Sequence, residues 1–195
     1  MIRHPQHYLN LLKDTDVEAV IAAALEVLNK AGLCIQSAQI QQYLVDAGFR
    51  TDAGRQRVWF RPDQVEKHLS AAPAHWTLHA RNAQKNVILG GPQLHVAPGY
   101  GSAFMADAAG KRREATLADL RNFTTLSTHC DAVDIISCLP VEPTDIPPEL
   151  RTLEIMHSLL GLADKPLMGL VYSSEAIDDT LAMAKIVFGL SLIHI

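Results

Sequence analysis

Cysteine is scarce in this sequence, and no two of its three cysteines (Cys34, Cys130 and Cys138) form a CxxC pair. An odd number of unpaired cysteines fits a reducing compartment and offers no disulfide framework. Long apolar runs are missing too, since no window approaches the roughly 20 continuous apolar residues of a membrane-spanning helix. The first residues also lack the apolar stretch of a signal peptide. We therefore interpret the protein as soluble and cytoplasmic, without a membrane partner.

Runs of one charge are absent as well. The 17 Lys and Arg residues are outnumbered by 21 Asp and Glu residues, which gives a net charge of −4, and the basic residues form no stripe. Proteins that bind nucleic acid usually carry such a basic patch. The sequence therefore predicts no nucleic-acid partner, while its 48% hydrophobic content predicts a folded core.

Several familiar site motifs are also missing. There is no GxSxG, no phosphate-binding loop and no GxGxxG that follows a strand. His75 and His79 are four residues apart, but their segment resembles a strand and we place both at the surface. His129 and Cys130 are adjacent and lack a third ligand at a suitable spacing, so we expect no metal site. The cysteines, Cys138 above all, are interpreted as small buried hydrophobic residues.

The first 75 residues are rich in helices. An apolar stripe at helical spacing runs from about Asp16 to Ala31, and Gly32 offers a left-handed helix end. The stripe consists of Val17, Val20, Ile21, Ala24, Leu25, Leu28 and Ala31. A second helix is predicted over 37–47, a short strand over 58–60 and a third helix from Pro62.

A different pattern begins at Trp76. Residues 76–115 predict short strands over 76–80, 87–89 and 94–98, then a hairpin over 104–113. Residues 116–189 alternate between helices (116–127, 147–160, 174–188) and apolar strands (133–141, 166–172). Leu150, Leu153, His157 and Leu160 mark the apolar face of the second of these helices. Apolar strands bounded by helices predict a parallel sheet covered by helices, and a barrel is favoured because no dinucleotide-binding motif is present.

The last six residues, 190–195, break the alternation. They follow a helix that ends at Gly189 and form a bare apolar tail that resembles a translated sequencing adapter, with a natural strand as the alternative. We therefore expect the native sequence to be cut near Gly189. The rest would supply about three of the eight strand–helix units of a barrel, which needs roughly 250 residues. The predicted regions are thus 1–75 (helix-rich), 76–115 (hairpins and first barrel strand), 116–189 (truncated barrel) and 190–195 (tail).

Six segments, read in order, carry a family resemblance. They are LEVLNKAG (25–32), YLVDAG (43–48), APAHWTLHAR (72–81), PGYG (98–101), REATLADL (113–120) and KP (165–166). In order and spacing across residues 16–189 they resemble the trimethylamine methyltransferase family, which includes enzymes similar to glycine betaine methyltransferase.

The resemblance implies an α/β fold, here an incomplete TIM (β/α)8 barrel preceded by a helix-rich N-terminal region. It implies an enzyme that moves a methyl group from a tertiary or quaternary methylated amine to the cobalt of a corrinoid (cobalamin) carried by a separate corrinoid protein. The chain itself would bind no cofactor, the full-length protein would be a homo-oligomer, and the fragment alone would be inactive. Trimethylamine-specific members carry pyrrolysine later in the barrel, outside this sequence, and we favour the betaine type.

Barrel enzymes build their sites from the loops that follow the strands. A methylated ammonium is bound by aromatic faces and a carboxylate. The loops in question hold the candidate substrate-binding residues Gly99, Tyr100, Gly101, Glu142, Asp145 and Tyr172. All of these except Tyr172 have a plainer alternative: a turn for the glycines, packing for the tyrosine at 100 and solvated loop positions for the two carboxylates. Catalytic residues are not identified.

Two other function classes stay open. The helix-rich region and the hairpins would also suit a non-catalytic binding or assembly module, and the barrel would suit an enzyme of unrelated chemistry such as a lyase. Methyl transfer from a methylated amine to a corrinoid protein separates the methyltransferase from both.

Overall fold

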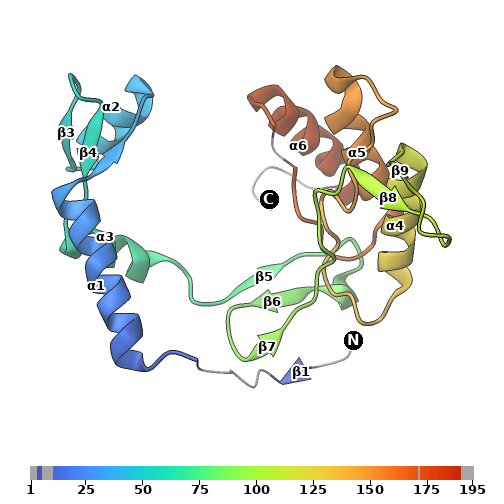
Figure 1. Ribbon diagram of the computed structural model, residues 1–195, viewed down its shortest axis with the longest axis horizontal. Helices are drawn as coiled ribbons and strands as arrows, with labels where there is room; N and C mark the ends of the chain where they lie inside the picture. Colours follow the sequence, from blue (N-terminus) through green and yellow to red (C-terminus); the bar gives the residue numbers. More distant parts are fainter. Residues whose placement is uncertain (1–3, 6–10, 171, 190–195) are drawn as a thin grey trace. The chain divides into compact units, whose positions relative to one another are not determined.

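The computed structural model describes residues 4–5, 11–170 and 172–189 (Figure 1). These residues form two compact units, which we call the N-terminal unit (11–74) and the C-terminal unit (β1 and 75–189). The described residues contain six α-helices and several short strands, so the α/β class is confirmed. The tail at 190–195 lies outside the described residues.

The N-terminal unit contains three helices and a small sheet. The helices are α1 (Asp14–Lys30), α2 (Ala38–Asp46) and α3 (Pro62–Ala71), and all three were predicted. The antiparallel sheet has the order β2-β4-β3, with β2 (Leu33–Cys34), β4 (Arg57–Trp59) and β3 (Arg50–Asp52). Only β4 was predicted, because two or three residues are too few to show an alternating pattern. Fully buried Val58 lies at the centre of the sheet.

Gly32 ends α1 in the left-handed conformation that the sequence predicts. Its φ is +68°, and its N–H donates to the Val27 carbonyl at 3.0 Å. A Cβ at this position would clash with the backbone carbonyl oxygen of Val58, so the sheet leaves no space for a side chain. Gly48 also has a positive φ, +84°, but a Cβ there would meet nothing within 4 Å.

These two glycines form a matched pair for a stability measurement. Gly48→Ala is expected to lower the free energy of unfolding by about 1 kcal/mol, the cost of a left-handed residue with a side chain. Gly32→Ala is expected to cost about 3 kcal/mol, because the clash with Val58 is added to the same conformational cost. Urea denaturation, monitored by circular dichroism, gives the free energy of unfolding of each variant for comparison. Equal losses would show that the carbonyl contact is relieved without cost.

The C-terminal unit begins with short antiparallel pairs. β5 (Trp76–Leu78) pairs with β6 (Val87–Leu89), with the 3₁₀ turn η1 (Ala83–Lys85) between them, and β1 (His4–Pro5) pairs with β7 (Gln93–Leu94). β8 (Phe104–Ala106) and β9 (Arg112–Glu114) form the predicted hairpin. The helices α4 (Leu117–His129), α5 (Pro148–Leu162) and α6 (Ser174–Phe188) follow, each close to its predicted range, and α5 packs against both of the others.

Residues 133–142 form the buried centre of this unit. They lie between the segment 96–102 and the segment 166–168. On one side the Gly101 N–H donates to the Leu139 carbonyl at 2.9 Å, and on the other the Ile136 N–H donates to the Pro166 carbonyl at 2.8 Å. Both isolated bridges that result, Ser102–Val141 and Ile136–Leu167, are parallel. The predicted parallel direction is therefore present.

The prediction of long strands in these segments was wrong. Among the described residues, 133–141 and 166–170 contain only these isolated bridges, 94–98 is a strand only at Leu94, and no closed barrel is formed. Proline explains part of the difference, since Pro140 and Pro166 have no N–H to donate to a ladder. Asp134 explains another part, because its carboxylate, and not a backbone carbonyl, accepts the Val96 N–H at 3.0 Å.

The main core lies between these segments and the helices. Its members are Ala115, Leu120, Ile136, Cys138, Leu139, Val141, Ile155, Met156, Leu159, Leu160, Ala163 and Leu170. The predicted face of α5 was partly wrong: Leu160 is buried, but Leu150 and His157 are exposed, and Ile155 and Leu159 are the fully buried residues. The buried face is therefore turned toward the side of α5 that also carries Arg151.

Candidate functional site

Two of the predicted loop segments lie side by side. The Glu142 N–H donates to the Ser102 carbonyl at 2.8 Å, directly beyond the contact between Gly101 and Leu139. Gly101 has a φ of +87°, which turns the chain sharply after Tyr100, and both Gly99 and Gly101 leave open space where a side chain would be. The parallel pairing thus places the 99–101 turn beside Glu142.

Glu142 pairs with Arg151, a residue that the sequence analysis missed. The Arg151 guanidinium Nη1 lies 3.1 Å from Glu142 Oε1, and the Glu142 side chain remains 34% exposed. Burial raises the pKa of the Tyr172 phenol, and the negative charge of Glu142 raises it further. Both effects keep the Tyr172 phenol neutral. An aromatic ring and a carboxylate are the groups that attract an organic cation.

Arg151 could have been found from helical spacing. It precedes Ile155 by four residues and Leu159 by eight, so it continues the buried face of α5 toward the helix start. An arginine on such a face needs a carboxylate partner, because an unpaired buried charge is costly. Its Nε is buried and has no hydrogen-bond partner among the described residues.

The other two candidates are placed differently. Asp145 is exposed, and its Oδ1 accepts the backbone N–H of Leu117 at 2.8 Å, so it satisfies a free donor at the start of α4. Tyr100 is exposed on the turn between the two glycines. The structure thus places Gly101 beside Glu142 and puts Tyr172 at a cavity between α5 and the start of α6. It gives Asp145 a helix-end role and leaves the Tyr100 ring facing solvent.

One of the family-like segments, 113–120, forms a hydrogen-bonded network at the start of α4. Both guanidinium Nη atoms of Arg113 bind the Asp119 carboxylate, at 2.6 and 2.8 Å. The same carboxylate accepts the Thr116 N–H at 2.9 Å and the Thr116 hydroxyl at 2.8 Å. Arg113 and Thr116 together hold the pKa of Asp119 well below its usual range. The network fixes α4 against the β8–β9 hairpin.

Asp119→Asn is expected to lower the free energy of unfolding by about 2 kcal/mol near neutral pH, since charge-assisted bonds and a helix cap are lost. Because the folded pKa is depressed, the stabilisation is complete above the unfolded pKa of about 4 and is lost as the pH falls toward the folded value. The gap between wild type and variant should therefore narrow below about pH 4. Urea denaturation at a series of pH values measures it, and a constant gap would contradict this account.

Another family-like segment, KP at 165–166, contains a buried lysine whose ammonium binds backbone carbonyls at the C-terminal end of α4. Lys165 Nζ donates to the carbonyls of Ser127, Cys130 and Val133 at 2.9, 2.7 and 2.7 Å. Burial lowers the pKa of this ammonium, and the neighbouring charge of Lys85 lowers it further. A cation at a helix C-terminus faces the negative end of the helix dipole.

The remaining residues considered above lie apart from this site. His75, His79 and His129 are exposed. Cys138 is buried as predicted, and burial raises the pKa of its thiol. The same prediction was wrong for Cys34, on a two-residue strand, and for Cys130, at the end of α4, both of which are exposed.

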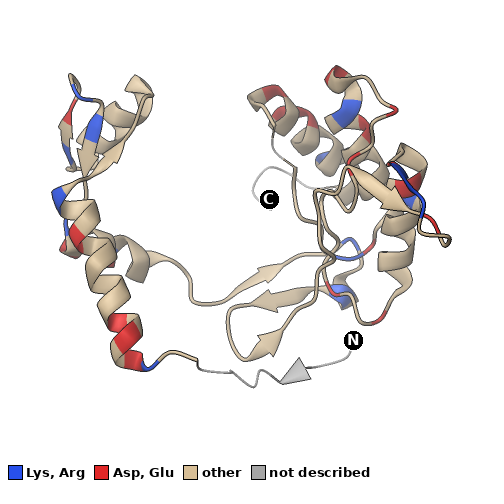
Figure 2. Ribbon diagram, in the orientation of Figure 1, with Lys and Arg blue, Asp and Glu red and all other residues tan. Residues whose placement is uncertain are grey.

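Acidic and basic residues are interspersed over the described parts of both units (Figure 2). Within the same residues, no group of three or more His, Cys, Asp or Glu side chains is placed to hold a metal ion. Of the helices that the structure describes, none is long and apolar enough to cross a membrane.

Comparison with known proteins defines the class. A glycine betaine methyltransferase of Desulfitobacterium hafniense (strain Y51) is 31% identical over 180 residues, which cover 92% of this chain and 37% of the relative. The trimethylamine methyltransferase MttB of Desulfitobacterium hafniense (strain DSM 10664 / DCB-2) is 27% identical over 179 residues, 90% of this chain and 36% of the relative. Both relatives are methyltransferases, and the chain spans little more than a third of their length.

The sequence model of the trimethylamine methyltransferase family matches residues 1–194. The chain belongs to this family, as its six segments predicted.

Proposed function

We propose that the full-length protein moves a methyl group from a tertiary or quaternary methylated amine to the cobalt of a corrinoid that a separate protein carries. The family match over residues 1–194 is the observation that carries this proposal. The more similar of the two relatives described above is a glycine betaine methyltransferase, which favours a betaine-type amine. The corrinoid is a co-substrate in this proposal, and the chain holds no cofactor of its own.

The fold proposed for the full-length protein is a TIM (β/α)8 barrel. Support comes from the parallel bridges Ser102–Val141 and Ile136–Leu167, which align three successive segments in one direction. Helices α4 and α5 occupy the two connections between these segments and α6 follows the last of them, as barrel helices do. We expect the 195-residue chain alone to be inactive, because it spans little more than a third of its relatives.

The residues at the ends of these segments suit a cationic substrate. The methylated nitrogen carries a positive charge, and when the C–N bond breaks its electron pair stays on nitrogen, so a quaternary amine leaves as a neutral amine without a proton donor. The site therefore has to hold and orient the cation more than supply acid–base catalysis. Glu142 provides the negative charge, and Tyr172 and Tyr100 provide aromatic faces.

Arg151 has a positioning role in this proposal. Its ion pair with Glu142 Oε1 holds the carboxylate at one end, and the partial exposure of Glu142 leaves it accessible to a ligand. Asp145, which serves α4, adds negative charge near the same loop without direct contact with the substrate.

The proposal is tested with purified full-length protein and a corrinoid protein reduced to the cobalt(I) state. Glycine betaine, trimethylamine and related amines are added singly, and methylation of the corrinoid is followed by its absorption spectrum. We expect methylation with at least one methylated amine and none with the fully demethylated analogue. No methylation with any amine would overturn the proposal.

A further inference from the structure

Helix α1 carries its apolar stripe on the outside of the N-terminal unit. None of its residues is buried, although Val17, Val20 and Ile21 follow the helical spacing of a core face. Two leucines just before the helix, Leu11 and Leu12, are exposed as well. Together with the three helix residues, their exposed fractions lie between 42% and 84%. Apolar side chains gathered on one exposed face mark an interaction surface.

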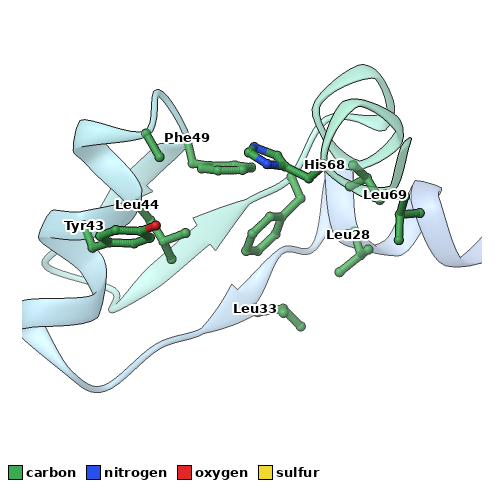
Figure 3. A pocket seen from close by; sticks show the side chains of 10 residues that line it. Leu28, Leu33, Tyr43, Leu44, Phe49, His68 and Leu69 are labelled. Atoms are coloured by element: carbon green, nitrogen blue, oxygen red, sulfur yellow. The ribbon is translucent and has the colours of Figure 1, made fainter. Parts of the chain in front are cut away.

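An apolar groove lies at the C-terminal end of the same helix (Figure 3). Its volume is about 500 Å³. It is lined by Leu28, Leu33, Tyr43, Leu44, Ala47, Phe49, Phe60, Val65, His68 and Leu69. The Phe49 ring packs against both Phe60 and His68, with ring centroids 5.1 and 5.6 Å away. Leu28 belongs to both the stripe and the groove, so the two surfaces are continuous.

The stripe is symmetric about the middle of α1, between Ala22 and Ala23. Its apolar residues are equidistant from this midpoint in three pairs: Val17 with Leu28, Val20 with Leu25, and Ile21 with Ala24. Two antiparallel copies related by a two-fold axis would therefore place apolar residues opposite apolar residues along the whole stripe. Continued past the helix, the same register brings Leu12 of one copy opposite Leu33, at the wall of the groove.

The charges of α1 favour the same arrangement. Asp14 and Asp16 lie in its first turn, and Lys30 lies in its last turn, where it also contacts Glu26. Arg57 extends the basic end, since its guanidinium donates to the Ala31 carbonyl at 2.7 Å. Figure 2 shows acidic residues, with a basic residue beside them, at one end of the helix and residues of both signs at the other. Antiparallel pairing sets the acidic end against the end that holds Lys30 and Arg57 and aligns the helix dipoles favourably. Parallel pairing sets the two acidic ends together.

We propose that two copies of this chain associate through antiparallel α1 helices, with Leu11 and Leu12 of each copy in the groove of the other. The helix contact is about 25 Å long, from 1.5 Å per residue. The proposal gives one partner to three features that are exposed among the described residues of the unit: the N-terminal part of the stripe, the two leucines and the groove. Leu25 and Leu28 are only partly buried by the rest of the unit. The proposal is independent of the proposed methyl transfer, which uses residues of the C-terminal unit.

Sedimentation velocity over a range of concentrations tests the association. We expect a reversible dimer for the 195-residue chain. Ile21→Glu should weaken it at least tenfold, because a carboxylate is buried at the centre of the stripe. Ala19→Glu, which adds the same group on the opposite and exposed face of α1, should leave it unchanged. A monomeric wild type, or a dimer equally tolerant of both variants, would overturn the proposal. So would a loss of thermal stability in Ile21→Glu without any change of mass, which would indicate that the chain covers its own stripe.

Site-specific cross-linking tests the register. In a background of Cys34→Ser and Cys130→Ser, Ala24→Cys lies close to the two-fold axis and its copies should be joined efficiently by a short bis-maleimide. Val17→Cys should not be joined to its own copy, because antiparallel pairing separates the two positions by about 16 Å along the helix. Efficient joining at position 17, or none at position 24, would contradict the antiparallel arrangement.

Discussion

Lys165→Met is expected to lower the free energy of unfolding by about 4 kcal/mol, the largest stability effect that we predict. The lysine is only 7% exposed, and its ammonium satisfies three backbone carbonyls at and beyond the end of α4. Methionine keeps most of the apolar volume but donates no hydrogen bond. Three part-buried carbonyls then lose a charged donor, and a hydrogen bond to a charged group contributes about 1.5–3 kcal/mol.

Lys85→Met is the matched control. The Lys85 side chain is 35% exposed and pairs with Asp164 at 2.7 Å. A surface ion pair of this kind contributes about 0–1 kcal/mol, so the same substitution should have a small effect here. Thermal and urea denaturation of both variants give the comparison. Similar losses for the two lysines would show that the carbonyl contacts of Lys165 contribute no more than a surface ion pair.

Glu142→Gln in the full-length protein is expected to raise the amine concentration required for half-maximal methyl transfer by about tenfold, or about 1.4 kcal/mol. Glutamine has the same shape but lacks the charge that attracts the ammonium. Because Glu142 is partly exposed, the fold should be retained, and an unchanged circular dichroism spectrum checks this. Methyl transfer measured across a series of amine concentrations gives the result.

The aromatic residues allow a finer test of the same site. Tyr172→Phe keeps the ring and should change amine binding little, whereas Tyr172→Ala and Tyr100→Ala should each weaken it by about 0.5–2 kcal/mol, the usual range of a cation–π contact. His75→Ala and His79→Ala, at exposed positions outside the site, are the controls. If the Glu142 and Tyr100 variants behave like the wild type, these residues are loop positions and the amine binds elsewhere in the full-length protein.

Features set by neighbours in sequence could be predicted from the sequence. The helices, the hairpin at 104–114 and the left-handed end at Gly32 depend on spacing and caps within a few residues. The Thr116–Asp119 cap also depends on spacing within one helix turn, whereas the Arg113 pair that strengthens it depends on the approach of the hairpin. Burial of the 133–141 segment followed from its apolar composition.

Features set by contacts between distant segments could not be predicted. Lys165 reaches carbonyls more than thirty residues away, and no local pattern predicts that partner. Asp145 shows the same limit at the site. An exposed carboxylate after a strand suits both a substrate contact and a helix cap, and only the position of Leu117 decides for the cap. The apolar run at 133–141 predicts burial but not a ladder, which also requires free N–H groups on both sides.

The most direct test of the central claim follows the methyl group itself. Glycine betaine labelled with ¹³C in its methyl groups is incubated with the full-length protein and the reduced corrinoid protein, and the label is traced by mass spectrometry. We predict that one labelled methyl group appears on cobalt for each molecule of dimethylglycine formed, and that labelled trimethylamine competes less effectively. Methylated cobalt without label, or a demethylated amine formed without methylation of the corrinoid, would contradict the account.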